Sequence, residues 1–254
     1  MKYRPNESLS DLKSTHTPEA IERRLKYGPQ HNYVRDFVYG AVDGAVTTFA
    51  VVSGVAGAGL STQIVIVLGI ANLVGDGFSM AVGNYLGTKA EQELREQARQ
   101  IEEMHIKKIP EGEREEIRQI FAAKGFTGTD LDRAVDIITS NPKQWVELML
   151  TEEMGIASLG PSPWSAAFST FIAFLLFGSF PLLAFVYQWL FPAVQFNPFY
   201  WSTLITGFAF FGVGALKSKF VGKRWFLSGL ETLFVGGIAA GLAYVVGVLL
   251  KGII

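Results

Sequence analysis

The chain has 254 residues, of which 49% are apolar and only 18% charged, and its mean hydropathy of +0.28 is high for a soluble domain. It contains no cysteine, which excludes a disulfide framework, a thiolate zinc site and a cysteine nucleophile. A net charge of −1 excludes a strongly basic nucleic-acid binder.

Charged residues are almost absent from three long stretches. Between residues 37 and 88 the only charges are Asp43 and Asp76, and residues 154–216 are 63 consecutive residues with none. Residues 225–250 carry a single acidic residue. A hydrocarbon core about 30 Å thick needs about 20 apolar residues of helix, so the stretches hold two, two and one spans. We predict transmembrane helices near 34–58, 63–88, 164–190, 199–217 and 225–250.

Lysine and arginine concentrate at one end of these spans. Seven precede the middle of the first span and four lie between the fourth and fifth spans, whereas the turns at the opposite end carry no charge. This bias predicts a cytoplasmic N-terminal segment over residues 1–32 and an external C-terminus. Glu231, in the fifth span, is expected to snorkel or pair near Lys223 and Arg224 rather than to line a path. With no cleavable signal and no sorting extension visible, we expect a prokaryotic inner membrane rather than a vacuolar one.

Residues 89–160 are expected to form a small helical cytoplasmic domain between the second and third spans. Residues 90–160 hold 15 acidic and 9 basic residues, and such an acidic lobe suits a cationic ligand. The helical pattern of the second span continues to about Lys108, and shorter helices are expected over 111–124, 129–139 and after Pro142. Apolar residues are too few for an independent core, so the lobe is expected to lean on a partner. The predicted fold is an all-α membrane protein whose parts are residues 1–32, 33–88, 89–160 and 161–254.

Two carboxylates fall near the middle of predicted spans, Asp43 in the first and Asp76 in the second. A carboxylate at membrane depth costs a few kcal/mol and by default faces a polar pathway. In the second span Asn72, Asp76, Met80 and Asn84 recur every four residues and share one helix face. Their oxygen and thioether donors suit a partly dehydrated divalent cation. The alternative is a pair of protonated aspartates that only hold glycine-rich helices together.

The acidic lobe carries three pairs of potential metal ligands at helical spacing, so each pair shares a helix face. Carboxylate with imidazole suits Fe(II), Mn(II), Co(II) or Zn(II), and a thioether adds a preference for softer ions. A solvated acidic face is the alternative interpretation. The pairs are Glu102 with His105, Glu113 with Glu116, and Met149 with Glu153.

Three segments resemble the vacuolar iron transporter family. They are DGAVTTFAVVSGVAGA at 43–58, GFSMAVGNYLGTKAE at 77–91, and NPKQWVELM at 141–149 followed by EMG at 153–155. The resemblance implies a five-span homodimer with an ion path between the two first spans, and a cytoplasmic metal-binding domain on an extended second helix. It also implies Fe(II) export from the cytoplasm in exchange for protons. It assigns pathway roles to Asp43 and Met80, and ligand roles to Glu102, Glu113, Glu116, Met149 and Glu153.

The chain departs from the family pattern at three positions. Asn72 stands where a carboxylate is expected, and Asp76, one turn further on, is expected to replace it. His105 stands in place of a glutamate, and Leu150 in place of a second methionine. Imidazole binds iron but also favours zinc, and losing a thioether makes the site less soft.

The resulting expectation is a proton-coupled antiporter that moves Fe(II), and secondarily Mn(II) or another divalent transition metal, out of the cytoplasm. It is expected to be a secondary transporter and not an enzyme, without a prosthetic group, acting as a homodimer in the bilayer without nucleic acid. No P-loop pattern is present, so ATP is not indicated. A membrane-tethered di-iron oxidase or iron store is the alternative, because Glu102-x-x-His105 has the spacing of ferritin-like sites. A metal-sensing scaffold is a third possibility.

Overall fold

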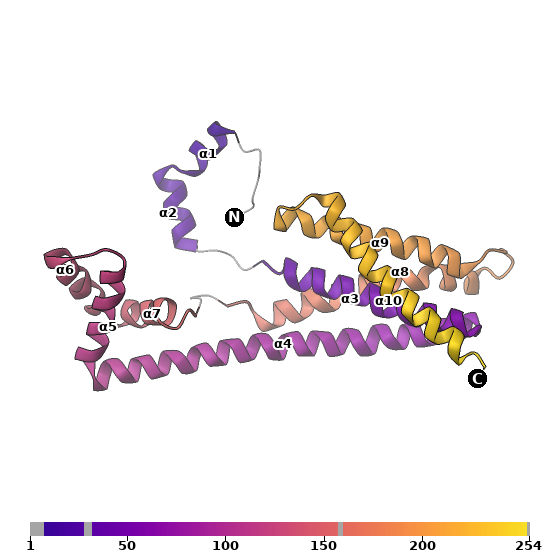
Figure 1. Cartoon of the computed structure of the whole chain (residues 1–254), viewed down its shortest axis with the longest axis horizontal. Helices are drawn as coiled ribbons and strands as arrows, with labels where there is room; N and C mark the ends of the chain where they lie inside the picture. The colour runs from indigo at the N-terminus through magenta and orange to yellow at the C-terminus, as the bar shows by residue number, and fades with distance from the viewer. Residues whose placement is uncertain (1–7, 28–31, 157–159, 253–254) are drawn as a thin grey trace. The chain divides into compact units, whose positions relative to one another are not determined.

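The computed structural model describes residues 8–27, 32–156 and 160–252, and within these ranges the regular structure is entirely α-helical (Figure 1). The chain divides into two compact units. We call Met1–Tyr85 with Pro163–Ile254 the membrane unit and Leu86–Ser162 the insert unit. The helices are α1 (Leu9–Thr15), α2 (Pro18–Tyr27), α3 (Val34–Ala58), α4 (Thr62–Lys108), α5 (Pro110–Ala123), α6 (Gly128–Thr139), α7 (Pro142–Glu152), α8 (Pro163–Leu190), α9 (Pro198–Val221) and α10 (Trp225–Leu250).

Five of these helices, α3, α4, α8, α9 and α10, are long and apolar enough to cross a membrane. They confirm the prediction of an all-α protein with five spans. The fourth span continues a few residues past the predicted end at 217, because the first left-handed residue that can end it is Gly222, with φ of 71°. The continuation of the second span is also confirmed, since α4 is unbroken over 47 residues.

Helix α3 is central to the membrane unit and packs against α8, α9 and α10. Its glycines allow close approach: a Cβ atom on Gly44 would lie 2.9 Å from the Cα of Phe174 in α8, and one on Gly40 would collide with the backbone of Thr170. Backbone contact of this kind is how small residues stabilise helix pairs in membranes. The core between these helices includes the buried side chains of Val52 and Phe210.

The membrane-spanning part of α4 is far less covered than α3. Val67 and Phe78 are each more than 60% exposed. At Gly75, Gly83 and Gly87 no described atom lies within 4 Å of the place a Cβ would take. In a bilayer such a face contacts lipid or another helix.

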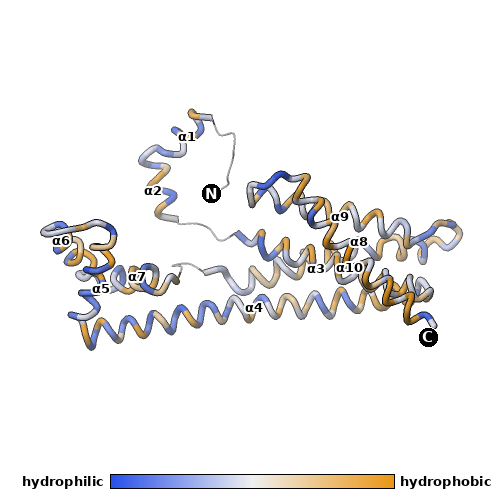
Figure 2. Tube along the Cα trace, in the orientation of Figure 1, coloured by the Kyte–Doolittle hydropathy of each residue, from blue (hydrophilic) through white to orange (hydrophobic). Residues whose placement is uncertain are grey.

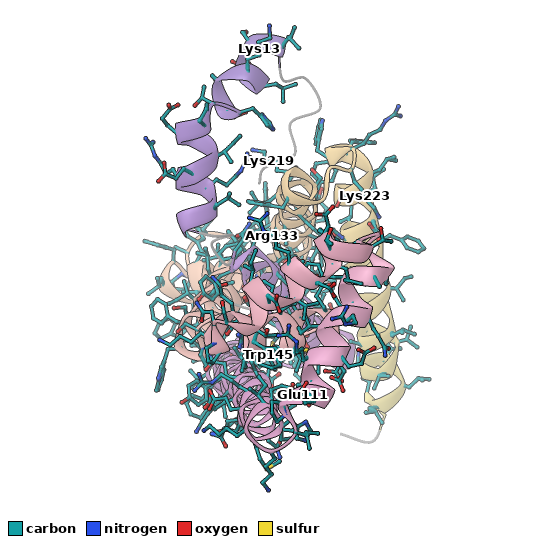
Figure 3. The ribbon with its side chains drawn as sticks, turned by 90° about the vertical axis from the view of Figure 1, so that its left-hand side faces the viewer. Lys13, Glu111, Arg133, Trp145, Lys219 and Lys223 are labelled. Atoms are coloured by element: carbon teal, nitrogen blue, oxygen red, sulfur yellow. The ribbon has the colours of Figure 1, made fainter. Side chains whose placement is uncertain are left out.

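The insert unit combines the end of α4 with α5, α6 and α7, and Figure 3 looks onto these helices from the end marked by Glu111, Arg133 and Trp145. Figure 2 shows more hydrophilic residues in α5 and α6 than in α10. Contrary to the expectation that apolar residues are too few, the unit has a core of its own. Its buried members are Ile117, Val135, Trp145 and Met149.

Turn residues and ion pairs fix the short helices of the insert unit. Pro110 begins α5 directly after α4 ends. The side-chain oxygen of Asn141 accepts hydrogen bonds from the backbone at the start of α7. Between helices, Arg95 forms an ion pair with Glu147 at 2.9 Å. Further pairs join Arg114 to Asp136, Arg118 to Asp132, and Lys124 to Glu152.

Candidate metal centre and intramembrane polar face

Three potential metal ligands meet where α4 turns into α5. Glu102 and His105 lie on one face near the end of α4, and the turn before Pro110 brings Glu113, in the first turn of α5, against them. The ligand atoms of the three side chains lie within 4.8 Å of one another. The Nδ1 atom of His105 is 3.4 Å from Oε1 of Glu113 and 4.0 Å from Oε1 of Glu102. A single ion can therefore contact all three side chains.

Both glutamates of this cluster are buried, with 2% of each residue exposed. The Oε2 atoms of Glu102 and Glu113 have no hydrogen-bond partner among the described residues. An unpartnered buried carboxylate oxygen is costly, and buried charges in proteins are commonly paired or bound to metal. The two unpartnered oxygens are therefore available as ligands for a cation.

The pKa values of the glutamates in the cluster are raised by burial and by neighbouring negative charges. Burial, followed by the negative charges of Glu116 and Glu102, raises the pKa of Glu113 to about 7. Burial also raises the pKa of Glu102, while the nearby His105 opposes the shift. The pKa of Glu153, a residue that is exposed but partly desolvated, is raised by that desolvation and then by the charges of Glu116 and Glu102. Glu116 and Glu153 therefore belong to the electrostatic surroundings of the three central ligands.

The structure brings five of the six candidate ligands of the lobe into one charge cluster. Glu116 and Glu153 are exposed at its edge. The sixth, Met149, is fully buried in the apolar core with Ile117 and Trp145. Two carboxylates and an imidazole suit Fe(II), Mn(II) or Zn(II).

The ligand set is smaller than that of a di-iron bundle. Such a site takes two Glu-x-x-His motifs and two further glutamates from long helices. In the part of the chain that the structure describes, Glu102, His105 and Glu113 form the one group of three such side chains within ligand distance. The oxidase or storage alternative is therefore not favoured.

Polar side chains also join α3 to α4 inside the membrane unit. The amide of Asn72 donates to Oγ1 of Thr47 at 3.3 Å and to Oγ1 of Thr48 at 3.2 Å. Towards the other end, the amide of Asn84 donates to Oδ1 of Asp36 at 3.0 Å. The same amide reaches Thr170 of α8 at 2.7 Å. The predicted stripe on α4 thus faces α3 at both of its ends.

Asp43 and Asp76 lie between these two amide contacts. Asp43 is half-buried and Asp76 is exposed on the described chain. Met80, also in the stripe, packs against the apolar core of the membrane unit. We call Asn72, Asp76, Met80 and Asn84, together with the residues that they contact, the polar face of α4. It covers about 18 Å of helix.

Sequence analysis missed Asp36 as a member of this face. It lies in the first turn of α3, seven residues before Asp43, and seven residues are close to two helical turns. That spacing is the signal that could have found it. The hydroxyl of Thr170 adds a hydrogen bond to the backbone oxygen of Asp36 at 3.3 Å.

Comparison with known proteins identifies the family of the chain. A sequence model of the VIT family matches residues 34–248. The chain is 34% identical to vacuolar iron transporter 1 of Arabidopsis thaliana, over 93% of this chain and 92% of that protein. It is 32% identical to the vacuolar iron transporter of Toxoplasma gondii, over 98% and 88%. It is 32% identical to that of Plasmodium berghei, over 87% and 83%. With a family match across all five spans and the insert unit, the chain belongs to the VIT family.

Proposed function

We propose that this integral membrane protein transports Fe(II) out of the cytoplasm in exchange for protons. The observation that carries the proposal is the polar face of α4, where Asp43 and Asp76 lie between two amide contacts. Ionisable residues inside spans commonly mark ion and proton pathways. The names of three relatives, each a vacuolar iron transporter, support iron as the cargo.

The cluster in the insert unit is proposed to capture the ion first. Glu102, His105 and Glu113 offer two carboxylates and an imidazole to one cation. Because the pKa of Glu113 is about 7, part of this site is protonated near neutral pH. Metal binding requires deprotonated ligands and therefore releases a proton. The metal-binding domain is proposed to face the cytoplasm, as are the N-terminal residues.

Inside the membrane, Asp43 and Asp76 are proposed to replace part of the hydration shell of the ion. Two neighbouring carboxylates repel each other unless a cation or a proton neutralises one of them. A divalent ion and protons therefore compete for the same pair. Protons arriving from the far side would displace the ion and leave the pair neutral for the return step. This competition is the physical basis that we propose for antiport.

The finer parts of the proposal follow from the family resemblance and the charge bias. We propose a homodimer with the ion path between the two copies, and the open positions along Gly75, Gly83 and Gly87 leave room for a second helix. Mn(II) is the second proposed substrate, with Co(II) and Zn(II) as further candidates because His105 supplies imidazole. An inner bacterial membrane remains our prediction for the location, while the relatives compared here are named as vacuolar.

The test is metal-dependent proton flux in proteoliposomes that hold a pH dye, with Fe(II), Mn(II), Co(II) and Zn(II) compared side by side. Asp43→Asn keeps the shape of the side chain but removes its charge, and we expect it to abolish transport. Metal binding by the purified full chain should be retained, since Glu102 and Glu113 are unchanged. Asp130→Asn, an exposed position in α6, is the matched control and should transport normally.

Each contrary result has a distinct meaning. Normal uptake by Asp43→Asn would remove that carboxylate from the pathway. Absence of flux with every ion, combined with oxygen consumption on adding Fe(II), would support the di-iron alternative. Flux with Zn(II) but not Fe(II) would overturn the assignment of iron while leaving the transport mechanism in place.

A further inference from the structure

A cleft with a volume of about 640 Å³ lies between α3, α9 and α10 in the membrane unit. Its walls are mainly apolar, with Val38 and Val42 from α3 and Val235 from α10. Val235 is 55% exposed, so the cleft opens on the outer surface of the described chain. The polar face of α4 contributes no residue to it.

One end of the cleft is charged. Arg35, in the first turn of α3, lines it and is exposed, and it forms no ion pair or hydrogen bond with any described residue. Lys217 of α9 lies across the cleft and pairs with Glu231 of α10 at 3.6 Å. Among the described residues Glu231 therefore pairs with Lys217, from an adjacent helix, and no ion pair joins it to Lys223 or Arg224. Two cations and one carboxylate leave the charged end with a net positive charge.

The charged end coincides with the ends of three spans. Arg35 is one residue after the start of α3, Lys217 is in the last two turns of α9, and Glu231 is in the second turn of α10. Figure 1 shows the turn from α9 to α10 near the start of α3. Val42 lies about 10 Å further along α3 than Arg35. The cleft therefore passes from the membrane boundary into the apolar zone.

A charged end followed by apolar walls matches one class of ligand. We propose that the cleft binds an anionic glycerophospholipid, with its phosphate at Arg35 and Lys217 and an acyl chain along Val38, Val42 and Val235. A guanidinium can donate two hydrogen bonds to one phosphate, and basic pockets between spans bind anionic headgroups. An apolar helix from a second copy would fill the cleft but leave the charge of Arg35 without a counter-ion.

Glu231 sets the selectivity of the site. Its carboxylate competes with the lipid phosphate for Lys217, because both are anions within reach of the same ammonium group. A lipid with a net negative headgroup gains from the remaining positive charge, whereas a zwitterionic lipid brings a third cation to the same place. The site therefore prefers phosphatidylglycerol to phosphatidylcholine.

The experiment is native mass spectrometry of the full chain after exchange into equimolar phosphatidylglycerol and phosphatidylcholine. The wild-type protein should retain phosphatidylglycerol preferentially. The double variant Arg35→Gln with Lys217→Gln should lower that preference about tenfold. Glu231→Gln should change it in the opposite direction, by raising retention a few-fold. Lys219→Gln, an exposed lysine of the same helix that lies outside the cleft, is the matched control and should leave retention unchanged (Figure 3).

Two results would overturn the proposal. The first is equal retention of phosphatidylglycerol by the wild-type protein and the double variant. The second is loss of a dimer in the double variant at every lipid composition, which would make the cleft an interface between copies. If the double variant fails to fold, Glu231→Gln decides alone, and unchanged or lower retention would count against the site. None of these readouts depends on which ion the protein carries.

Discussion

The two units differ in which of their buried polar side-chain atoms have hydrogen-bond partners. In the membrane unit, Asn72 and Asn84 donate to partners on neighbouring helices. Among the described residues of this unit, the buried side-chain atoms without a partner are hydroxyls such as those of Ser53 and Thr206. In the insert unit, the unpartnered atoms include one carboxylate oxygen each from Glu102 and Glu113. A buried hydroxyl costs little compared with a buried charge. The membrane unit therefore satisfies its partly buried amides, whereas the insert unit leaves two buried carboxylate oxygens without a partner among the described residues.

The largest expected effect comes from removing one of these two buried carboxylates. Glu113→Gln removes a central ligand and should weaken Mn(II) binding by at least about tenfold, since loss of an outer-shell partner alone commonly costs that much. The metal-free protein should become more stable near and above neutral pH, because a buried carboxylate whose Oε2 has no described partner is replaced by a neutral amide. Calorimetric titration and thermal unfolding of the full chain measure the two effects. Equal loss of binding and stability would mean that Glu113 is structural.

The pH dependence of the metal-free protein sharpens the comparison. The pKa of Glu113 is raised from 4.5 to about 7, so between these values the folded state holds a proton that the unfolded state releases. Stability should therefore fall as pH rises from about 4.5 to 7, while Mn(II) affinity rises over the same interval. Thermal unfolding at several pH values measures the first trend. A slope that persists unchanged in Glu113→Gln would assign it to another group.

A smaller effect is expected in the membrane unit. Asn84→Ala removes the hydrogen bonds to Asp36 and Thr170, and interhelical hydrogen bonds of this kind contribute about 1 kcal/mol in membranes. We expect a modest loss of stability in detergent, and no change in Mn(II) binding by the insert unit. Ser79→Ala, at an exposed position on the same helix, is the control. A loss of metal binding in Asn84→Ala would erase the distinction between the two regions.

The smallest effect should come from the ion pairs on the surface of the insert unit. Arg118 and Asp132 both keep much of their side chains in solvent, and exposed pairs contribute at most about 1 kcal/mol. Arg118→Ala should therefore leave Mn(II) affinity unchanged and lower stability only slightly, less so at high salt. A large loss of affinity would mean that these pairs position the ligands of the cluster.

Much of the fold could be predicted because charge is scarce and its placement is informative. The spans are long uncharged stretches, and Pro110 and Gly222 limit their helices at the polar ends. The core of the insert unit was underestimated, because Ile117 and Trp145 come from different short helices and their meeting is a tertiary contact. The periodicity of a single helix gives no information about that contact.

The same distinction between spacing within one helix and tertiary contact applies to the candidate site. Spacing within α4 was enough to pair Glu102 with His105, since both lie on one helix. The approach of Glu113 depends on the direction of the turn between α4 and α5, which spacing does not determine. For the same reason the partner of Glu231 was predicted as a neighbour in sequence, whereas the structure supplies Lys217 from an adjacent helix.

The glycines of the membrane unit offer a way to detect neighbours that a single chain does not contain. On α3, Gly40 and Gly44 are fixed by the chain itself, because an added methyl group would strike α8. On α4, the chain itself places no such demand on Gly75 or Gly83. A scan of larger side chains along α4 would thus act as a contact map of the assembled protein. Positions that reject bulk there would mark where another molecule touches the helix, and positions that accept it would mark lipid.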